Sequence, residues 1–205
     1  NEIRHARSHH RNDERGRLQG RNRRVNLLSS APWTIYVDGS CLGNQNVDAD
    51  TPAAWAVVVI TGDTGLGRGT GSLVEEFAGH VITRSDEPNF IGAEVGSNNT
   101  AELTAIAEAL RWLLTEGGGD EAIIRADSQY AGNLASGAWK AKANRALVAH
   151  VQELWTTVSL LRPLSWEHVR AHRGHRWNER ADHLALRKAN NENPAPLSFW
   201  KPGQR

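Results

Sequence analysis

The sequence predicts an α/β protein with one five-stranded mixed sheet flanked by helices on both faces. Three segments with the apolar patterns of strands come first, and helical and strand patterns alternate after them. Consecutive strands favour an antiparallel meander, whereas strands separated by helices favour parallel pairing through crossovers. The 205 residues, 39% of them hydrophobic, are enough for one sizeable core with tails.

The first three strands are predicted by their hydrophobic patterns. Residues 33–38 alternate apolar and polar side chains and stop at Gly39, which indicates a strand. Residues 53–60 are continuously apolar and rich in valine, as expected of a strand covered on both faces. A weaker third strand is expected within residues 73–83, between two irregular stretches that have the composition of loops.

Helical spacing begins after the third strand. Asn98 or Asn99 is expected to cap a long helix that ends at the glycines of residues 117–119. One face of this helix carries Leu103, Ile106, Leu110, Leu113 and Leu114. This apolar face is expected to pack on the sheet.

The remaining elements alternate between strand and helix. In chain order they are a strand at 122–126, a short helix at about 128–134, a helix at about 144–161, a strand at 164–170 and a helix that begins near 178 and fades before 193. The helix at 144–161 is expected to bury five apolar residues at helical spacing: Leu147, Val151, Leu154, Trp155 and Val158.

The net charge of +1 conceals a basic tail on a mildly acidic body. Residues 1–30 hold eight arginines and three acidic residues, which leaves 16 basic and 20 acidic side chains elsewhere. This tail is poor in large apolar residues, so we expect it to be disordered in isolation. Its arginines suit an arm that attracts phosphate, with a targeting remnant or a solvating tail as the alternatives. Residues 31–192 are expected to form the folded domain, and residues 193–205 a loose C-terminal tail.

Several classes of protein are excluded by composition. No apolar run approaches the roughly 18 residues of a membrane span, and no apolar block near the N-terminus resembles a signal peptide. The single cysteine, Cys41, excludes an intrachain disulfide and suits a reducing compartment. We therefore expect a soluble intracellular protein, in the cytoplasm, the nucleus or an organelle. We expect a monomer without a membrane partner, unless the chain is part of a larger polypeptide or assembly.

Four acidic residues fall where the predicted elements bring the chain together. Asp38 lies on the first strand, Asp127 ends the fourth, and Glu102 and Asp182 lie in the opening turns of two helices. The crevice beyond the carboxyl ends of parallel strands is the usual site in such folds. Carboxylates gathered there repel one another unless divalent cations neutralise them, and oxygen ligands favour Mg²⁺ or Mn²⁺. Each acid alone is more often a solvated charge or a helix cap, so the prediction depends on their context.

Four short segments supply that context. In chain order they are Asp38–Asn44, Asn98–Leu103, Asp127–Tyr130 and His172–Asp182. Together they resemble the four signature blocks of type 1 ribonuclease H, over about residues 33–190. The resemblance implies a ribonuclease H-like fold, and it implies that residues 31–192 form a catalytic domain. The implied activity is that of an endonuclease that hydrolyses the RNA strand of RNA/DNA hybrids.

The resemblance also implies roles for single residues. Asp38, Glu102, Asp127 and Asp182 are expected to hold two Mg²⁺ ions, for which Mn²⁺ could substitute, at the scissile phosphate. His172 matches the family's mobile-loop histidine and is expected to assist proton movement or product release.

A zinc cluster of histidines is the alternative for His172. Its partners would be His168, His175 and His183. A strand and the loop after it would scatter these four side chains, so we do not expect the cluster.

Six residues resemble the family's substrate contacts: Asn44, Ser97, Asn98, Asn99, Gln129 and Trp139. The side-chain amides of the three asparagines and Gln129 are expected to contact minor-groove base edges and 2′-hydroxyls. Helix capping or turn formation is the other role open to these residues. Ser97 is expected to help hold a phosphate of the DNA strand at the start of a helix. Trp139 is the family's candidate for stacking on a sugar of the DNA strand, although a tryptophan is more often buried in the core.

The sequence departs from the family in its basic protrusion. The segment between Asp127 and His172 is too short for the full bacterial form and keeps only Trp139, Lys140, Lys142 and Arg145. The arginine-rich tail could compensate for the weaker substrate surface. The turn after the first block and the connection to Glu102 also differ from those of compact members.

Two other functions stay open at this point. One is the ribonuclease H domain of a retroelement reverse transcriptase, and the other is a catalytically inactive module that serves as a nucleic-acid-binding or assembly subunit. Retention of four acids and His172 favours an enzyme, because a scaffold has no need for clustered like charges.

Overall fold

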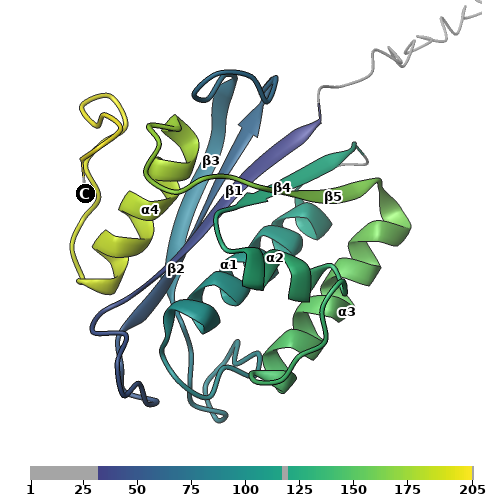
Figure 1. Ribbon diagram of the computed structural model, residues 1–205, viewed down its shortest axis with the longest axis vertical. Helices are drawn as coiled ribbons and strands as arrows, with labels where there is room; N and C mark the ends of the chain where they lie inside the picture. Colours follow the sequence, from purple (N-terminus) through teal and green to yellow (C-terminus); the bar gives the residue numbers. More distant parts are fainter. Residues whose placement is uncertain (1–31, 117–119, 205) are drawn as a thin grey trace, which may run out of the picture.

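The computed structural model describes residues 32–116 and 120–204, and its strands form one mixed sheet (Figure 1). The strands are β1 (Trp33–Cys41), β2 (Ala53–Thr61), β3 (Ser72–His80), β4 (Ala122–Ala126) and β5 (Leu164–His168). Their order across the sheet is β3-β2-β1-β4-β5. The first three strands pair antiparallel, and β4 and β5 continue the sheet in parallel from β1. The predicted mixed sheet is confirmed.

Four helices cover the two faces of this sheet. They are α1 (Asn98–Thr115), α2 (Gln129–Ala135), α3 (Arg145–Leu161) and α4 (Arg176–Ala189). Figure 1 shows α1, α2 and α3 together on one face, with α4 on the other. None of the helices in the described ranges is long and apolar enough to cross a membrane.

The alternation of side chains along the central strands creates two cores. Ile35 and Val37 of β1 pack in the larger core with α1 and α3, whereas Tyr36 packs with α4. In β2, Val57 faces the first core and Val58 the second, so this strand is buried on both sides as its apolar run predicted.

The start of α1 differs from the prediction that Asn98 or Asn99 caps it. Ser97 is the N-cap, because its Oγ accepts from the Thr100 backbone N–H at 3.1 Å and the Thr100 hydroxyl accepts from the Ser97 N–H at 2.9 Å. This reciprocal pair satisfies two donors at once, which a single asparagine cap does not. Asn98 and Asn99 consequently lie in the first helical turn.

Other boundaries shift by a few residues. α4 begins at Arg176, two residues before the predicted start, and β5 ends at His168 because its partner β4 ends opposite, at Ala126. Leu114 is exposed at the end of α1, and Leu154 and Trp155 of α3 are only partly buried.

The C-terminal segment packs against α4, in contrast to the loose tail that the sequence predicts. Trp200 is 5% exposed and lies against His183, with ring centroids 5.9 Å apart. The backbone of Ala195 is held on both sides: its carbonyl accepts from Arg180 at 2.7 Å and its N–H donates to His183 Nε2 at 3.0 Å. Burial of the indole and these hydrogen bonds offset the entropy of ordering the segment.

Replacing Trp200 with alanine should lower the free energy of unfolding by about 3 kcal/mol, since truncation of a buried tryptophan leaves a cavity. The neighbouring Phe199 is 79% exposed, so Phe199→Ala should change the free energy of unfolding by less than about 0.5 kcal/mol. Urea denaturation of the two variants measures the difference. Equal midpoints would show that the segment contributes nothing to the fold.

Candidate active site

The first two acids meet where β1 passes under the start of α1. A Cβ built on Gly39 would lie 2.4 Å from the backbone nitrogen of Glu102, so only glycine permits this approach of strand and helix. The Gly39 N–H donates to Asp38 Oδ1 at 2.8 Å, which orients that carboxylate. Asp38 and Glu102 are therefore neighbours although they are 64 positions apart in the sequence.

The third acid comes from the adjacent parallel strand. Val37 of β1 pairs with Ala126 of β4, so Asp38 and Asp127 follow at the same edge of the sheet. After Asp127 the chain turns directly into α2, because the Ser128 side chain accepts from the Ala131 N–H at 3.1 Å and caps the helix.

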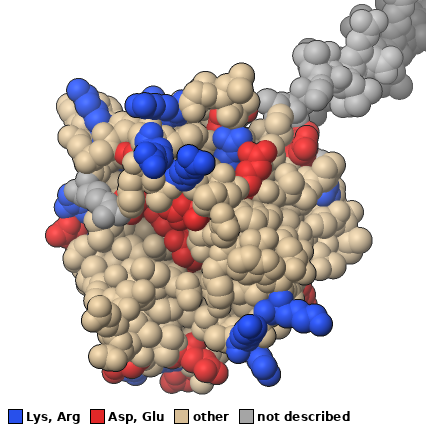
Figure 2. Space-filling model, in the orientation of Figure 1, with Lys and Arg blue, Asp and Glu red and all other residues tan. Residues whose placement is uncertain are grey.

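Three of the predicted acids form a compact group. Oxygens of Asp38, Glu102 and Asp127 all lie within 4.8 Å of one another, and in the described part of the chain this is the one such group of potential metal ligands. Asp182 of α4 stands outside that distance, but its charge raises the pKa of the other three. Figure 2 shows acidic side chains gathered in the middle of this face, over β1 and the start of α1.

Burial and mutual repulsion favour the protonated form of these carboxyls. Asp38 and Glu102 are 5% and 7% exposed. Burial, followed by the charge of Asp127, raises the pKa of Glu102 to about 8. Burial and the charges of Glu102 and Asp127 raise the pKa of Asp38 well above its ordinary value. The pKa of Asp127 is also raised by burial, and a hydrogen bond with the Asn178 side chain opposes that rise.

A divalent cation fits this group of ligands. All three side chains offer carboxylate oxygens, the donors that Mg²⁺ and Mn²⁺ prefer. Glu102 Oε2 is buried without a hydrogen-bond partner among the residues that the structure describes. A bound cation would satisfy this oxygen and remove the repulsion between the acids.

His172 lies on the connection between β5 and α4, close to the acids. Its charge lowers the pKa of Asp127, and with Asp182 it lines a cavity of about 290 Å³. The other three histidines have separate partners: His168 Nε2 lies 3.1 Å from the Asp127 carbonyl, His175 Nε2 lies 3.3 Å from the Tyr36 hydroxyl, and His183 accepts from Ala195.

The predicted substrate residues lie on the elements that carry the acids or adjoin them. Asn44 and Asn98 are adjacent, because Asn44 Oδ1 accepts from the Asn98 N–H at 3.1 Å. Gln129 is exposed at the start of α2. Ser97 is half-buried and engaged in the cap of α1.

Asn99 and Trp139 line the same open cavity, of about 620 Å³. Tyr130, Lys140 and Lys142 also line it. Trp139 is 48% exposed, so the alternative that it is a core residue is wrong. Its place on the connection between α2 and α3, which carries several exposed polar residues, keeps it at the surface.

Asn178 is a site residue that the sequence analysis did not predict. Its side chain is buried and hydrogen-bonds the Asp127 carboxylate, so it connects α4 to the end of β4. The available signal was its position in the last block, one helical turn before Asp182, which places both side chains on one face of α4.

Comparisons with known proteins agree with this geometry. A profile of the family described as RNase H matches residues 30–190. Ribonuclease H of Cupriavidus necator is 34% identical over 166 residues, which cover 75% of this chain and 92% of the relative. The structure resembles RNase H1 from the halophilic archaeon Halobacterium salinarum (TM-score 0.57, 26% identity, 78% of this chain and 99% of that chain). It shares its fold with LC11-RNase H1 in complex with an RNA/DNA hybrid (TM-score 0.53, 21% identity, 78% and 97% covered). The chain belongs to the ribonuclease H family.

Proposed function

We propose that this chain is an endonuclease that hydrolyses the RNA strand of RNA/DNA hybrids with two Mg²⁺ ions, for which Mn²⁺ can substitute. The observation that carries the proposal is the buried group of Asp38, Glu102 and Asp127, with Asp182 beside it, in a chain of this family. Asp38, Glu102, Asp127 and Asp182 would hold the two ions, which would supply an activated water for attack at phosphorus and charge to stabilise the departing oxygen. The product strand downstream of the cut then carries a 5′-phosphate.

The protein side chains supply position and proton transfer. Asn178 orients Asp127 through its hydrogen bond, and Gly39 holds Glu102 against Asp38 by the close contact of their backbones. His172 lies near Asp127 on an exposed connection, where it can take or release a proton as product leaves.

Recognition of the hybrid is assigned to the polar residues around the acids. Asn44, Asn98, Asn99 and Gln129 are exposed and offer amides to base edges and 2′-hydroxyls. Ser97, at the start of α1, supports a phosphate of the DNA strand together with the helix N-terminus. Trp139 offers an exposed ring for stacking on a sugar of that strand, beside Lys140 and Lys142.

A cleavage assay on a 5′-labelled hybrid tests the proposal. We expect cleavage of the RNA strand in Mg²⁺ and none in chelator, with single-stranded RNA, duplex RNA and duplex DNA left intact. Binding of the hybrid without cleavage would instead support the inactive module. A parent transcript that encodes a polymerase would identify the retroelement domain, which shares this chemistry.

The basic tail lies outside the described residues, and we propose that residues 1–30 act as an electrostatic arm. Deleting them should weaken hybrid binding and reduce the slope of log affinity against log salt by about 0.9 for each phosphate that the tail neutralises. The rate at saturating hybrid should hardly change, because a uniform loss of binding raises KM alone.

A tail of the same length with its eight arginines changed to glutamine is the matched control. It separates charge from chain length, and it should behave as the deletion does. If the plots of log affinity against log salt are parallel for the three proteins, the tail does not bind phosphate. Targeting or partner binding would then be its role.

A further inference from the structure

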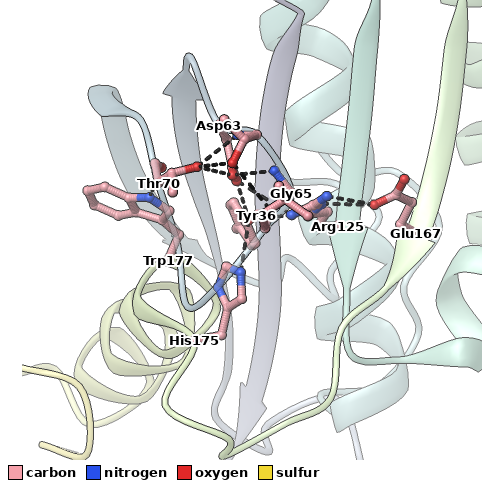
Figure 3. A network of polar contacts seen from close by, with 10 residues as sticks. Tyr36, Asp63, Gly65, Thr70, Arg125, Glu167, His175 and Trp177 are labelled. Atoms are coloured by element: carbon pink, nitrogen blue, oxygen red, sulfur yellow. Dashed lines mark hydrogen bonds and ion pairs between the residues drawn. The ribbon is translucent and has the colours of Figure 1, made fainter.

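The loop between β2 and β3 is held to the sheet by a buried carboxylate (Figure 3). The Asp63 side chain is 1% exposed. Its Oδ1 accepts from the Gly65 N–H and from the Thr70 hydroxyl, both at 2.9 Å, and its Oδ2 accepts from the Tyr36 hydroxyl. These bonds close residues 63–70 into a compact loop with a defined conformation.

Arg125 balances the charge of this carboxylate and connects it to the parallel strands. Its guanidinium lies 3.5 Å from Asp63, donates to the Tyr36 hydroxyl at 2.9 Å and pairs with Glu167 of β5 at 2.8 Å. The loop is therefore attached to β1, β4 and β5 at once, the strands that carry or flank the catalytic acids.

The same loop packs against the start of α4, next to the connection that carries His172. The Arg176 N–H donates to the Arg68 carbonyl at 2.8 Å, and Trp177 Nε1 donates to the Thr70 carbonyl at 2.7 Å. A Cβ on Gly69 would lie 3.0 Å from the Cβ of Arg176, so the two segments are in close contact.

This contact gathers three arginines at one surface, which we call the Arg68 surface: Arg68, Arg173 and Arg176. All three are exposed, and within the described ranges none forms an ion pair with a carboxylate. The acid in the first turn of α4, Glu179, is engaged with the N–H groups of Gly174 and Gly203, at 2.6 and 2.5 Å. Unpaired positive charge is notable here, because the chain outside residues 1–30 has four more acidic than basic side chains.

The Arg68 surface is adjacent to the acids and separate from the cavity beside Trp139. Figure 2 shows blue side chains over the β2–β3 loop and the connection into α4, a second blue group at the lower right, and acidic side chains between them. A duplex that crosses the acids and reaches both groups would pass phosphates over the Arg68 surface, since a duplex carries one charge about every 1.7 Å.

We propose that Arg68, Arg173 and Arg176 bind backbone phosphates of the hybrid beyond the scissile position. The proposal rests on the hybrid-cleaving function proposed above. The three side chains are exposed, which suits a polyanion lying across them. They add affinity without sequence preference.

The double variant Arg68→Gln/Arg173→Gln tests this proposal in the full chain. We expect KM for a long hybrid to rise roughly tenfold, kcat to stay within about twofold, and the salt slope to fall by about 1 to 2, as when one or two fewer phosphates are neutralised. The matched control is Arg187→Gln/Lys188→Gln, which removes two charges from the last turn of α4, about 17 Å along the helix from Arg176. The control should match the unaltered protein.

Hybrid length distinguishes the proposed contacts from others. When the hybrid is shortened from the end that reaches the Arg68 surface, the double variant and the unaltered protein should have the same KM. When it is shortened from the other end, the difference in KM should remain. An unchanged KM and salt slope in the double variant would overturn the proposal, as would an effect that persists when either end is shortened. If none of these proteins cleaves any hybrid, the proposed function itself fails.

Discussion

Replacing Asp127 with asparagine should lower the rate of hybrid cleavage by at least about a thousandfold and leave the fold intact. Loss of a metal ligand forfeits several kcal/mol of transition-state stabilisation, which corresponds to three or more powers of ten in rate. The amide oxygen of asparagine can still accept the hydrogen bond from Asn178, so the local structure is preserved. Removing one of several crowded charges relieves repulsion, and the melting temperature of the metal-free protein should stay level or rise.

Asp38→Asn should behave in the same way, because its Oδ1 can still accept from the Gly39 N–H. Single-turnover cleavage at saturating Mg²⁺ and thermal melts in chelator measure the two effects. Asp86→Asn, the same change at an exposed position away from the acids, is the matched control and should leave both unchanged. An active Asp127→Asn protein would refute the assignment of the acids.

The architecture was predictable because hydrophobic periodicity reports directly on which faces are buried. The continuous apolar run of β2 corresponds to a strand with cores on both sides, and the alternation in β1 sends Ile35 and Tyr36 into different cores. The element order then limited the topology to a meander joined to parallel strands by helical crossovers.

Features that depend on tertiary partners were not predictable in this way. The choice of Ser97 over Asn98 as the cap of α1 depends on the reciprocal bond with Thr100. The packing of the C-terminal segment depends on His183 and Arg180, which hold Ala195 from another part of the chain. Asp63 lies in a glycine-rich stretch that has only the composition of a loop, and its partners Tyr36 and Arg125 are distant in sequence.

The candidate site was likewise predictable only in part. The positions of Asp38 and Asp127 follow from the rule that parallel strands end at one edge of the sheet. The prediction that Glu102 and Asp182 belong to the same site depended more on the family resemblance. The exposure of Trp139 could not be predicted from its own residue type, because a tryptophan is usually buried.

The metal-free protein should become less stable as pH rises from about 5 to 8.5. The pKa of Glu102 is about 8 in the fold and 4.5 ordinarily, so between these values the folded state binds more protons than the unfolded state. The stability from this proton is fully present below pH 4.5 and is lost as pH rises through 8. Asp38, whose pKa is also raised, adds to the same trend. We expect the melting temperature to fall by roughly 5–10 °C across this range.

Mg²⁺ should reverse this trend by replacing the bound protons. Millimolar Mg²⁺ should raise the melting temperature most at high pH, by mass action on the folded state, and its binding should release protons. Calorimetry in two buffers of different ionisation enthalpy detects that release. Glu102→Gln is the informative variant, since it removes the group with the pKa near 8 and should flatten the pH profile of the metal-free protein. A flat profile for the unaltered chain, with equal binding enthalpies in both buffers, would mean that the acids are ionised without metal. If millimolar Mg²⁺ also gave no shift in the melting temperature, the acids would bind no cation, and that result would favour the inactive module over the enzyme.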